Sequence, residues 1–177
     1  MKQNRIVLTG GPGTGKTSIV NALKTKGHFC FEEISREIIQ EEMEKGSDVL
    51  PWDNLDAFSE RVISGRLKQY ESAPEGISFY DRSIVDSIAY LHLDELPVNT
   101  DWHQLALSHQ YNKVVFITPP WKEIYETDNE RKESFNKLID LHEILWHTYE
   151  EYGYRLVEVP RMTIEERVNF IENQLNF

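Results

Sequence analysis

Residues 5–17 of this chain read RIVLTGGPGTGKT, a short β-branched run followed at once by a glycine-rich turn. The turn, residues 10–17, matches the pattern G-x-x-x-x-G-K-[ST] at every fixed position. The pattern needs an apolar strand before it and an amphipathic helix after it. Both are expected here, because Ile19, Val20 and Leu23 recur at helical spacing after the turn. The stretch therefore predicts a phosphate-binding loop between a buried strand and a helix.

The chemistry of such a loop explains its composition. Several consecutive backbone N–H groups must point into one concavity, which glycines allow without Cβ clashes. The helix that begins there adds the positive end of its dipole. Lys16 supplies a cation for the β- and γ-phosphates of a nucleotide, and the Thr17 hydroxyl is placed to bind Mg²⁺. The residues expected to bind the nucleotide are Gly10, Gly11, Pro12, Gly13, Thr14, Gly15, Lys16, Thr17 and Ser18.

Around this loop, short apolar runs alternate with longer amphipathic stretches, which is typical of an α/β domain with a parallel sheet. Strands are expected at residues 5–9, 28–31, 77–80, 113–118 and 154–159. Helices are expected at residues 16–26, 34–46, from an N-cap at Asp53 to Pro74, 83–93, around 138–152 and 164–175. Residues 97–101 are expected to form a loop, and the acidic run Glu41, Glu42 and Glu44 a solvated helix face.

Length and composition set the limits of function. The 177 residues, 40% hydrophobic and 28% charged, fit one globular domain spanning residues 1–177. The formal net charge of −11 argues against binding to nucleic acid or an anionic membrane but leaves room for one small basic pocket. The single cysteine, Cys30, allows no internal disulfide, and no run approaches the ~20 apolar residues of a membrane span. A cytoplasmic location is expected.

A guanine-specific switch does not fit the sequence. Such proteins carry N-K-x-D for the base and D-x-x-G at the switch. Asn112-Lys113 and Asn136-Lys137 are each followed by two apolar residues, so neither supplies the aspartate. The run Asp81-Arg82-Ser83-Ile84 lacks the glycine.

Polar residues follow the third expected strand at the edge where ligands bind. In an open α/β sheet, ligands lie outside the carboxyl ends of the strands, and Asp81 and Arg82 stand at such an end. Asp81 is a candidate to hold Mg²⁺ or to accept a proton from an attacking hydroxyl, and Arg82 to bind an anionic or sugar part of the acceptor. The alternative is an aspartate that caps the next helix beside a surface arginine.

The second expected strand ends in a similar way. Glu32 and Glu33 lie at its carboxyl end, and Arg36 follows one helical turn later. We favour Glu33 as the carboxylate that meets an acceptor hydroxyl, because the helical register carries Arg36 onto nearly the same side. The alternative is a solvated acidic helix start that the helix dipole favours.

These motifs together resemble one branch of the phosphate-loop proteins. A phosphate loop on the first strand, Glu33-x-x-Arg36 after the second, and Asp81-Arg82-Ser83 with Asp86 and Tyr90 after the third are similar to nucleoside and nucleotide kinases. The resemblance implies a three-layer α/β/α fold with a five-stranded parallel sheet in the order 2-3-1-4-5. It also implies Mg-ATP as the donor and a small hydroxyl-bearing acceptor.

A narrower resemblance is to a family of small AAA-type ATPases that includes ribosylnicotinamide-kinase-like domains. It is carried by Phe79-Tyr80-Asp81-Arg82-Ser83, followed by Asp86, Ala89 and Tyr90. The likeness runs through most of the chain and ends in Glu165-Glu166-Arg167. Members of this family differ in their substrates, so the likeness supports ATP better than any particular acceptor.

Kinases of this branch also close a short helical lid with arginines over the transferring phosphoryl group, which excludes water. The lid is expected at about residues 121–137. Residues 127–133 lie where it belongs, and within residues 127–133 only Arg131 and Lys132 could serve in it. Because a nucleoside monophosphate acceptor needs more cations, an uncharged acceptor fits better. The alternative for Arg131 is an exposed helical charge in an i,i+4 pair.

The leading hypothesis is an Mg-ATP-dependent kinase of a small, nucleoside-like metabolite, acting as a monomer or homodimer. The competing hypothesis is a nucleotide-dependent regulatory ATPase or binding module that acts through a protein partner. The candidate catalytic residues are Lys16, Glu33, Asp81, Arg82 and Arg131; the candidate Mg²⁺ ligands are Thr17 and Asp81; the candidate acceptor contacts are Glu33, Arg36 and Arg82.

Overall fold

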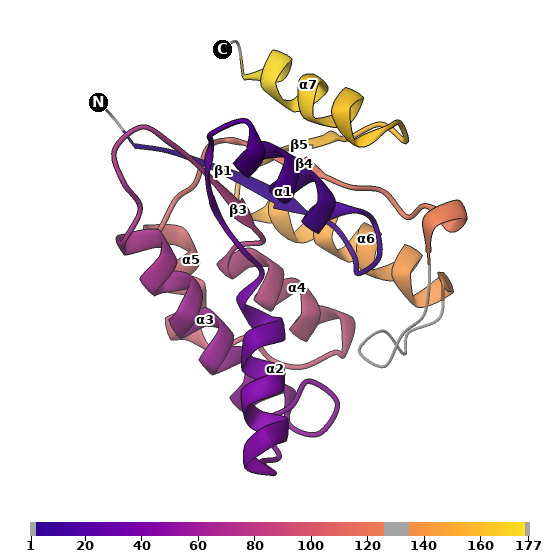
Figure 1. Cartoon of the computed structure of the whole chain (residues 1–177). Helices are drawn as coiled ribbons and strands as arrows, with labels where there is room; N and C mark the ends of the chain where they lie inside the picture. The colour runs from indigo at the N-terminus through magenta and orange to yellow at the C-terminus, as the bar shows by residue number, and fades with distance from the viewer. Residues whose placement is uncertain (1–2, 126–134, 176–177) are drawn as a thin grey trace.

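The computed structural model describes residues 3–125 and 135–175, and it has the expected α/β architecture (Figure 1). All strand pairs are parallel, and the order in the sheet is β2-β3-β1-β4-β5, as the family resemblance implies. The strands are β1 (Asn4–Thr9), β2 (Phe29–Phe31), β3 (Ile77–Asp81), β4 (Val114–Ile117) and β5 (Arg155–Glu158). The phosphate-loop strand β1 is therefore the central strand of the sheet.

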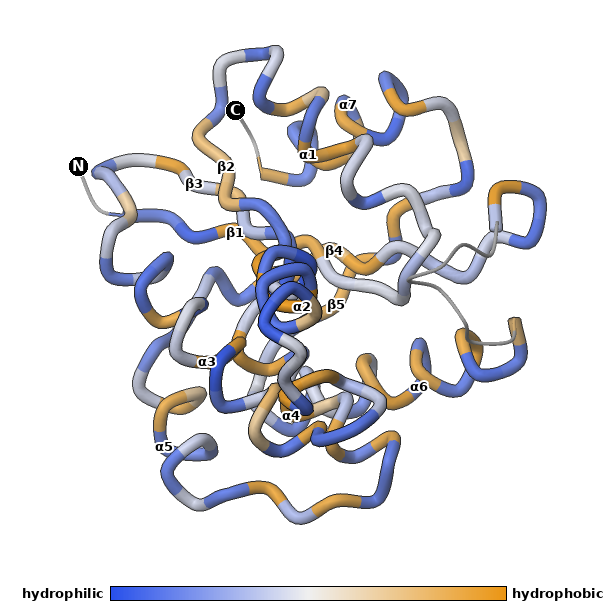
Figure 2. Tube along the Cα trace, turned by 60° about the horizontal axis from the view of Figure 1, so that its bottom comes forward, coloured by the Kyte–Doolittle hydropathy of each residue, from blue (hydrophilic) through white to orange (hydrophobic). Residues whose placement is uncertain are grey.

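Helices cover both faces of the sheet and give three layers (Figure 1). The helices are α1 (Lys16–Thr25), α2 (Ile34–Lys45), α3 (Leu55–Glu71), α4 (Ile84–Leu93), α5 (Thr100–Ser108), α6 (Phe135–Glu151) and α7 (Ile164–Gln174), with a 3₁₀ turn, η1 (Lys122–Ile124). The helices α1 and α7 pack together on one face, and α4 and α6 pack together on the other. In Figure 2 the tube of α2 is mostly hydrophilic, whereas α4 and α6 carry many hydrophobic positions.

The alternation of side chains along β1 explains why the sheet is buried on both faces. Ile6 and Leu8 pack into the cluster beneath α1 and α7, whereas Val7 packs into the cluster with α4 and α6. All three side chains are fully buried. Full burial of each such side chain contributes about 1.5–3 kcal/mol, so β1 and the loop that follows it stand on a rigid base.

The structure corrects two of the expected helix boundaries. The N-cap of α3 is Asn54 and not Asp53, because the Asn54 side chain accepts a hydrogen bond from the Ala57 N–H at 3.2 Å. The expected loop at residues 97–101 ends in a helix, α5, that the sequence analysis misses. Asn99 caps this helix, and Trp102 and Ala106 bury one side of it.

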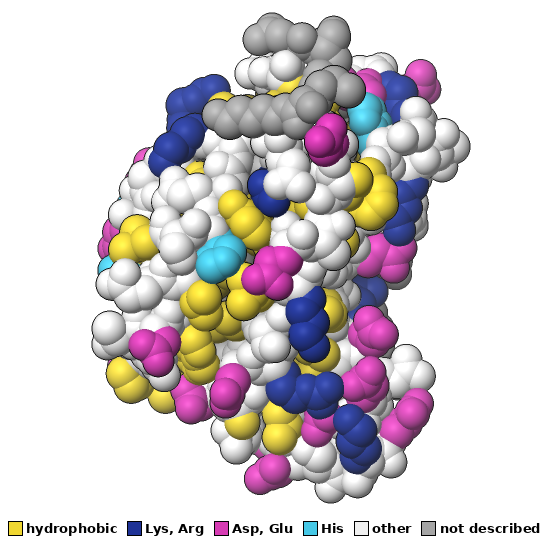
Figure 3. Space-filling model, turned by 90° about the vertical axis from the view of Figure 1, so that its left-hand side faces the viewer, with side chains coloured by type: hydrophobic (Ala, Val, Ile, Leu, Met, Phe, Trp, Pro, Cys, Tyr) yellow, Lys and Arg dark blue, Asp and Glu magenta, His cyan; other side chains and the backbone are white. Residues whose placement is uncertain are grey.

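The acidic run on α2 is only partly a solvated face. Glu42 is buried, with ion pairs to Arg61 of α3 and to Lys45. Opposite charges pair across the two helices in this region, and Figure 3 shows basic and acidic side chains next to one another on one face of the molecule. None of the described helices combines the length and the apolar content that crossing a lipid bilayer requires.

Candidate active site

The phosphate loop joins β1 to α1, and its glycines are dictated by close contacts. Gly10 has φ +132°, and a Cβ atom at this position would collide with the side chain of Thr118. Gly15 has φ +86°, and a Cβ atom there would lie 2.6 Å from Nη1 of Arg167. Both positions favour glycine because their backbone is in a region that L-residues rarely adopt. The tight turn leaves the exposed Thr17 and Ser18 at the start of α1.

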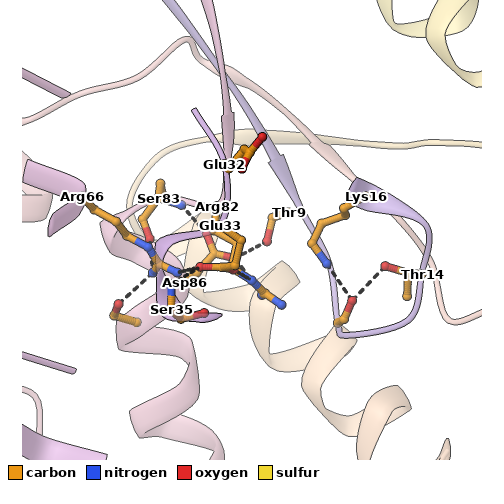
Figure 4. Close-up of polar contacts among 12 residues, drawn as sticks. Thr9, Thr14, Lys16, Glu32, Glu33, Ser35, Arg66, Arg82, Ser83 and Asp86 are labelled. Atoms are coloured by element: carbon orange, nitrogen blue, oxygen red, sulfur yellow. Dashed lines mark hydrogen bonds and ion pairs between the residues drawn. The ribbon is translucent and has the colours of Figure 1, made fainter. Parts of the chain in front are cut away.

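Two side chains of the phosphate loop donate hydrogen bonds to the loop's own backbone. The Thr14 hydroxyl donates to the Gly11 carbonyl at 2.8 Å, and Lys16 Nζ donates to the same carbonyl at 2.7 Å (Figure 4). Burial lowers the pKa of Lys16 to about 7, an effect that the Arg82 charge reinforces and the Asp81 charge opposes. The lysine is therefore a desolvated cation folded onto a neutral carbonyl, a contact that an anionic phosphate would replace with a stronger one.

The predicted acceptor carboxylate, Glu33, lies between two buried arginines (Figure 4). Arg66 Nη2 lies 3.1 Å from Glu33 Oε1, and Arg82 Nε forms an ion pair with Oε2. Burial alone would raise the pKa of Glu33, but the two guanidinium charges outweigh it and lower the pKa to about 2. Glu33 also caps α2 by accepting from the Ser35 N–H at 3.1 Å. The alternative of a solvated helix start is therefore wrong.

Arg82 is held in an unusual backbone conformation. Its φ of 78° lies in the left-handed region, which costs a non-glycine residue about 1 kcal/mol. The Arg82 N–H donates to the Leu8 carbonyl at 2.9 Å, and Nη1 lies 3.4 Å from Asp86 Oδ1. Its Cζ atom lies 5.4 Å from the centre of the Tyr90 ring. The alternative of a surface arginine is wrong, because the side chain is buried between carboxylates and an aromatic ring.

A buried carboxylate, Asp86, forms an ion pair with Arg82 and hydrogen bonds to three further groups. It accepts hydrogen bonds from the Thr9 hydroxyl at 2.5 Å, the Ser83 N–H at 2.7 Å and the Tyr149 hydroxyl at 2.5 Å. Ser83 and Asp86 form the capping box of α4, and Thr9 is the last residue of β1. Asp86 therefore ties β1, α4 and α6 to the site.

Asp81 does not cap α4, because Ser83 does, so the capping alternative is wrong for this residue too. Asp81 is 5% exposed, and no described residue hydrogen-bonds to its Oδ1 atom. Burial raises the pKa of Asp81 to about 6, although the Lys16 charge pulls it down. An unpartnered buried carboxylate oxygen close to Lys16 is a suitable ligand for a cation.

A cavity of about 520 Å³ joins these groups. The phosphate loop lines it together with Glu33, Arg36, Asp81 and Arg82. One wall of the cavity is apolar and consists of Ile39, Pro51, Leu55, Phe58 and Val62. Another part of the lining consists of Trp121, Ile124, Met162, Thr163, Ile164 and Arg167. The structure thus brings together the sequence-predicted site residues, except that Arg131 lies outside the described residues.

Sequence reasoning misses three buried groups of the site. Arg66 donates to the Ser83 carbonyl at 2.6 Å and to the Ser87 hydroxyl at 2.7 Å besides holding Glu33. Arg167 donates from Nη2 to the Thr14 carbonyl at 3.1 Å. Tyr149 reaches Asp86 from α6. None of the three has a local signal that marks it as a site residue; Arg167 enters the sequence analysis only as the end of the run Glu165-Glu166-Arg167.

Comparisons with known proteins agree with this architecture. A family model described as an AAA domain matches residues 5–167. No curated protein matches the chain.

Solved structures with a similar fold include several kinases. A deoxyadenosine kinase from M. mycoides with the products dCMP and dCDP bound is 16% identical, with a TM-score of 0.67, over 97% of this chain and 98% of that one. The NadR protein in complex with NR is 20% identical, with a TM-score of 0.70, and this chain spans 52% of its length. Thymidylate kinase from Candida albicans is 17% identical, with a TM-score of 0.65, over 99% and 92% of the two chains. These likenesses establish the fold.

Proposed function

We propose that this chain, which belongs to the AAA domain family, is an ATP-dependent kinase that phosphorylates a hydroxyl group of a small, nucleoside-like metabolite. The observation that carries the proposal is that one cavity is lined both by the phosphate loop and by Glu33, Asp81 and Arg82. A donor phosphate and an acceptor hydroxyl would meet there. Kinases among the structures of similar fold support the same reaction class.

The phosphate loop would bind the triphosphate of the donor. Lys16 would exchange its hydrogen bond to the Gly11 carbonyl for the β- and γ-phosphates. The negative phosphates would also favour the charged form of a lysine whose pKa burial lowers to about 7. The backbone N–H groups from Gly10 to Ser18 would supply the remaining donors.

Thr17 and Asp81 would hold Mg²⁺. The exposed Thr17 hydroxyl and the unpartnered Asp81 Oδ1 fit this ion, which takes few protein ligands and keeps phosphate oxygens and waters in the rest of its shell. The described residues contain no group of three or more His, Cys, Asp or Glu side chains that could hold a metal by itself. When bound, the ion neutralises charge on the transferring phosphoryl group.

Glu33 would orient the acceptor hydroxyl by accepting its hydrogen bond. With a pKa of about 2 the carboxylate is a weak base, but a loose phosphoryl-transfer transition state depends on positioning more than on strong deprotonation. Arg82 would bind the polar part of the acceptor, and Arg36 would do so at the cavity mouth. The apolar wall around Phe58 would pack against a flat, base-like part.

The lid belongs to the same proposal. We assign it to residues 121–137, with Arg131 over the transferring phosphoryl group, in a single domain of residues 1–177. Closure of such a lid excludes water and so limits hydrolysis of ATP.

ADP release measured across a panel of nucleosides, vitamins and sugars tests the proposal. Stimulation by one acceptor, lost in Lys16→Ala and retained in Lys24→Ala, is the expected result. Lys24 is the matched control because it lies on the same helix and pairs with Glu32 outside the cavity. ATP turnover without stimulation by any acceptor would favour the regulatory ATPase instead, and unchanged turnover in Lys16→Ala would overturn the nucleotide site itself.

A further inference from the structure

Arg167 is a buried cation that contacts the phosphate loop and lines the same cavity. It is the fourth residue of α7 and is 2% exposed. Its Nη2 atom donates to the Thr14 carbonyl at 3.1 Å, and its Cζ atom lies 5.7 Å from the centre of the Trp121 ring. Its Nη1 atom lies 2.6 Å from the position of a Cβ atom on Gly15. The guanidinium therefore touches the peptide that joins Thr14 to Gly15.

This cation has no anionic partner among the residues that the structure describes. No described carboxylate forms an ion pair with it, and its Nε atom has no hydrogen-bond partner among the described residues. Burial accordingly lowers the pKa of Arg167. A buried charge that is not paired destabilises a fold, so core packing alone does not explain an arginine at this position.

The geometry of the peptide bond suggests what the contact does. All peptide bonds of the described chain are trans, so the carbonyl of Thr14 and the N–H of Gly15 point in opposite directions from one peptide plane. An arginine that holds the carbonyl on one side of the loop fixes the N–H toward the other side. The phosphate loop needs the Gly15 N–H on its inner side, where phosphate oxygens would bind.

We propose that Arg167 is a positioning residue that orients the Thr14–Gly15 peptide so that the Gly15 N–H points into the phosphate cradle. The proposal rests on the proposed nucleotide site, because the cradle must bind phosphates for the orientation to matter. The positive charge of Arg167 beside the loop adds to the attraction for an anion bound in the cradle. The cation–π contact with the Trp121 ring helps to hold the guanidinium in this position.

Binding of two probes, Mg-ADP and Mg-tripolyphosphate, measured by titration calorimetry, tests the proposal. In Arg167→Met we expect both probes to bind about tenfold more weakly. This is the effect expected when one well-placed donor to the anion, the Gly15 N–H, is no longer oriented. Arg161→Met is the matched control, because Arg161 donates to the Pro120 carbonyl at 2.9 Å, is exposed and does not line the cavity. Its effect on either probe should stay below about twofold.

The melting temperature of the nucleotide-free protein separates positioning from a structural role. Because Met replaces an unpaired buried charge, we expect Arg167→Met to melt at the wild-type temperature or above it. Arg167→Gln, which keeps a shorter donor, provides a second variant if the first does not fold. Unchanged binding of tripolyphosphate in a folded variant would overturn the proposal, as would weaker binding of ADP alone. A wild-type protein that binds neither probe would instead overturn the nucleotide site.

Discussion

Replacing Glu33 tests whether one carboxylate is held between two buried arginines in solution. In the folded protein the pKa of Glu33 is about 2, against an ordinary value of 4.5, because Arg66 and Arg82 outweigh the effect of burial. A pKa that is depressed on folding stabilises the folded state above the unfolded-state pKa. That stabilisation is lost as the pH falls through the folded-state pKa.

The size of the effect follows from these two values. The difference between the unfolded-state and folded-state pKa of Glu33 corresponds to about 3 kcal/mol of stabilisation of the folded protein at pH 7. Between pH 6 and pH 3 the unfolded chain takes up a proton at residue 33 and the folded chain does not. Acidification from pH 6 to pH 3 therefore lowers the free energy of unfolding of the wild-type protein by about 2 kcal/mol through Glu33 alone.

Urea unfolding at several pH values between 6 and 3 measures this difference. Glu33→Gln should be less stable than wild type at pH 6, because Arg66 and Arg82 lose their shared anion, and the gap should narrow by about 2 kcal/mol at pH 3. Glu32→Gln is the control, since Glu32 is exposed and pairs with Lys24, and this variant should follow the wild-type curve. Parallel curves for wild type and Glu33→Gln would refute the double ion pair.

Three further predictions concern the cavity. Binding of Mg-ADP at pH 8 should take up about one proton, because a phosphate restores the charge of a lysine, Lys16, whose pKa is about 7; calorimetry in two buffers with different ionisation enthalpies measures this uptake. Asp81→Asn should raise the Mg²⁺ concentration for half-maximal turnover by at least about tenfold, and an unchanged Mg²⁺ titration would contradict its role. Phe58→Ala should raise the KM for the acceptor about tenfold in steady-state assays and leave that for ATP unchanged.

The fold was predictable because its signals are local or repeat along the chain. The phosphate loop needs glycine at Gly10 and Gly15, and the run RIVLT before it alternates between two buried faces of the sheet. Both features are visible in consecutive residues. The helix α5 was missed because its signal is weak, an asparagine cap at Asn99 and two buried side chains close to a proline.

The positions of candidate site residues were predictable only where the topology places them at strand ends. The prediction of Glu33, Asp81 and Arg82 needed nothing more than the rule that ligands bind at the carboxyl edge of a parallel sheet. Arg66 was not predictable, because it meets Glu33 across 33 positions of sequence and looks like an ordinary charge on an amphipathic helix. The same holds for Arg167, which reaches Thr14 across 153 positions.

The charge balance of the cavity bears on what the acceptor is. Two of the three buried arginines of the cavity already have anionic partners, Arg66 with Glu33 and Arg82 with Glu33 and Asp86, so neither is a spare cation for an acceptor phosphate. The third, Arg167, contacts the phosphate loop, where the donor would bind. Asp81 adds a further carboxylate beside them, and Arg36 is exposed, where water screens its charge. A phosphorylated acceptor would bring a dianion next to these carboxylates, where neither Arg66 nor Arg82 is free to pair with it. An uncharged hydroxyl compound would leave every ion pair in place, which supports a nucleoside-like acceptor over a nucleotide.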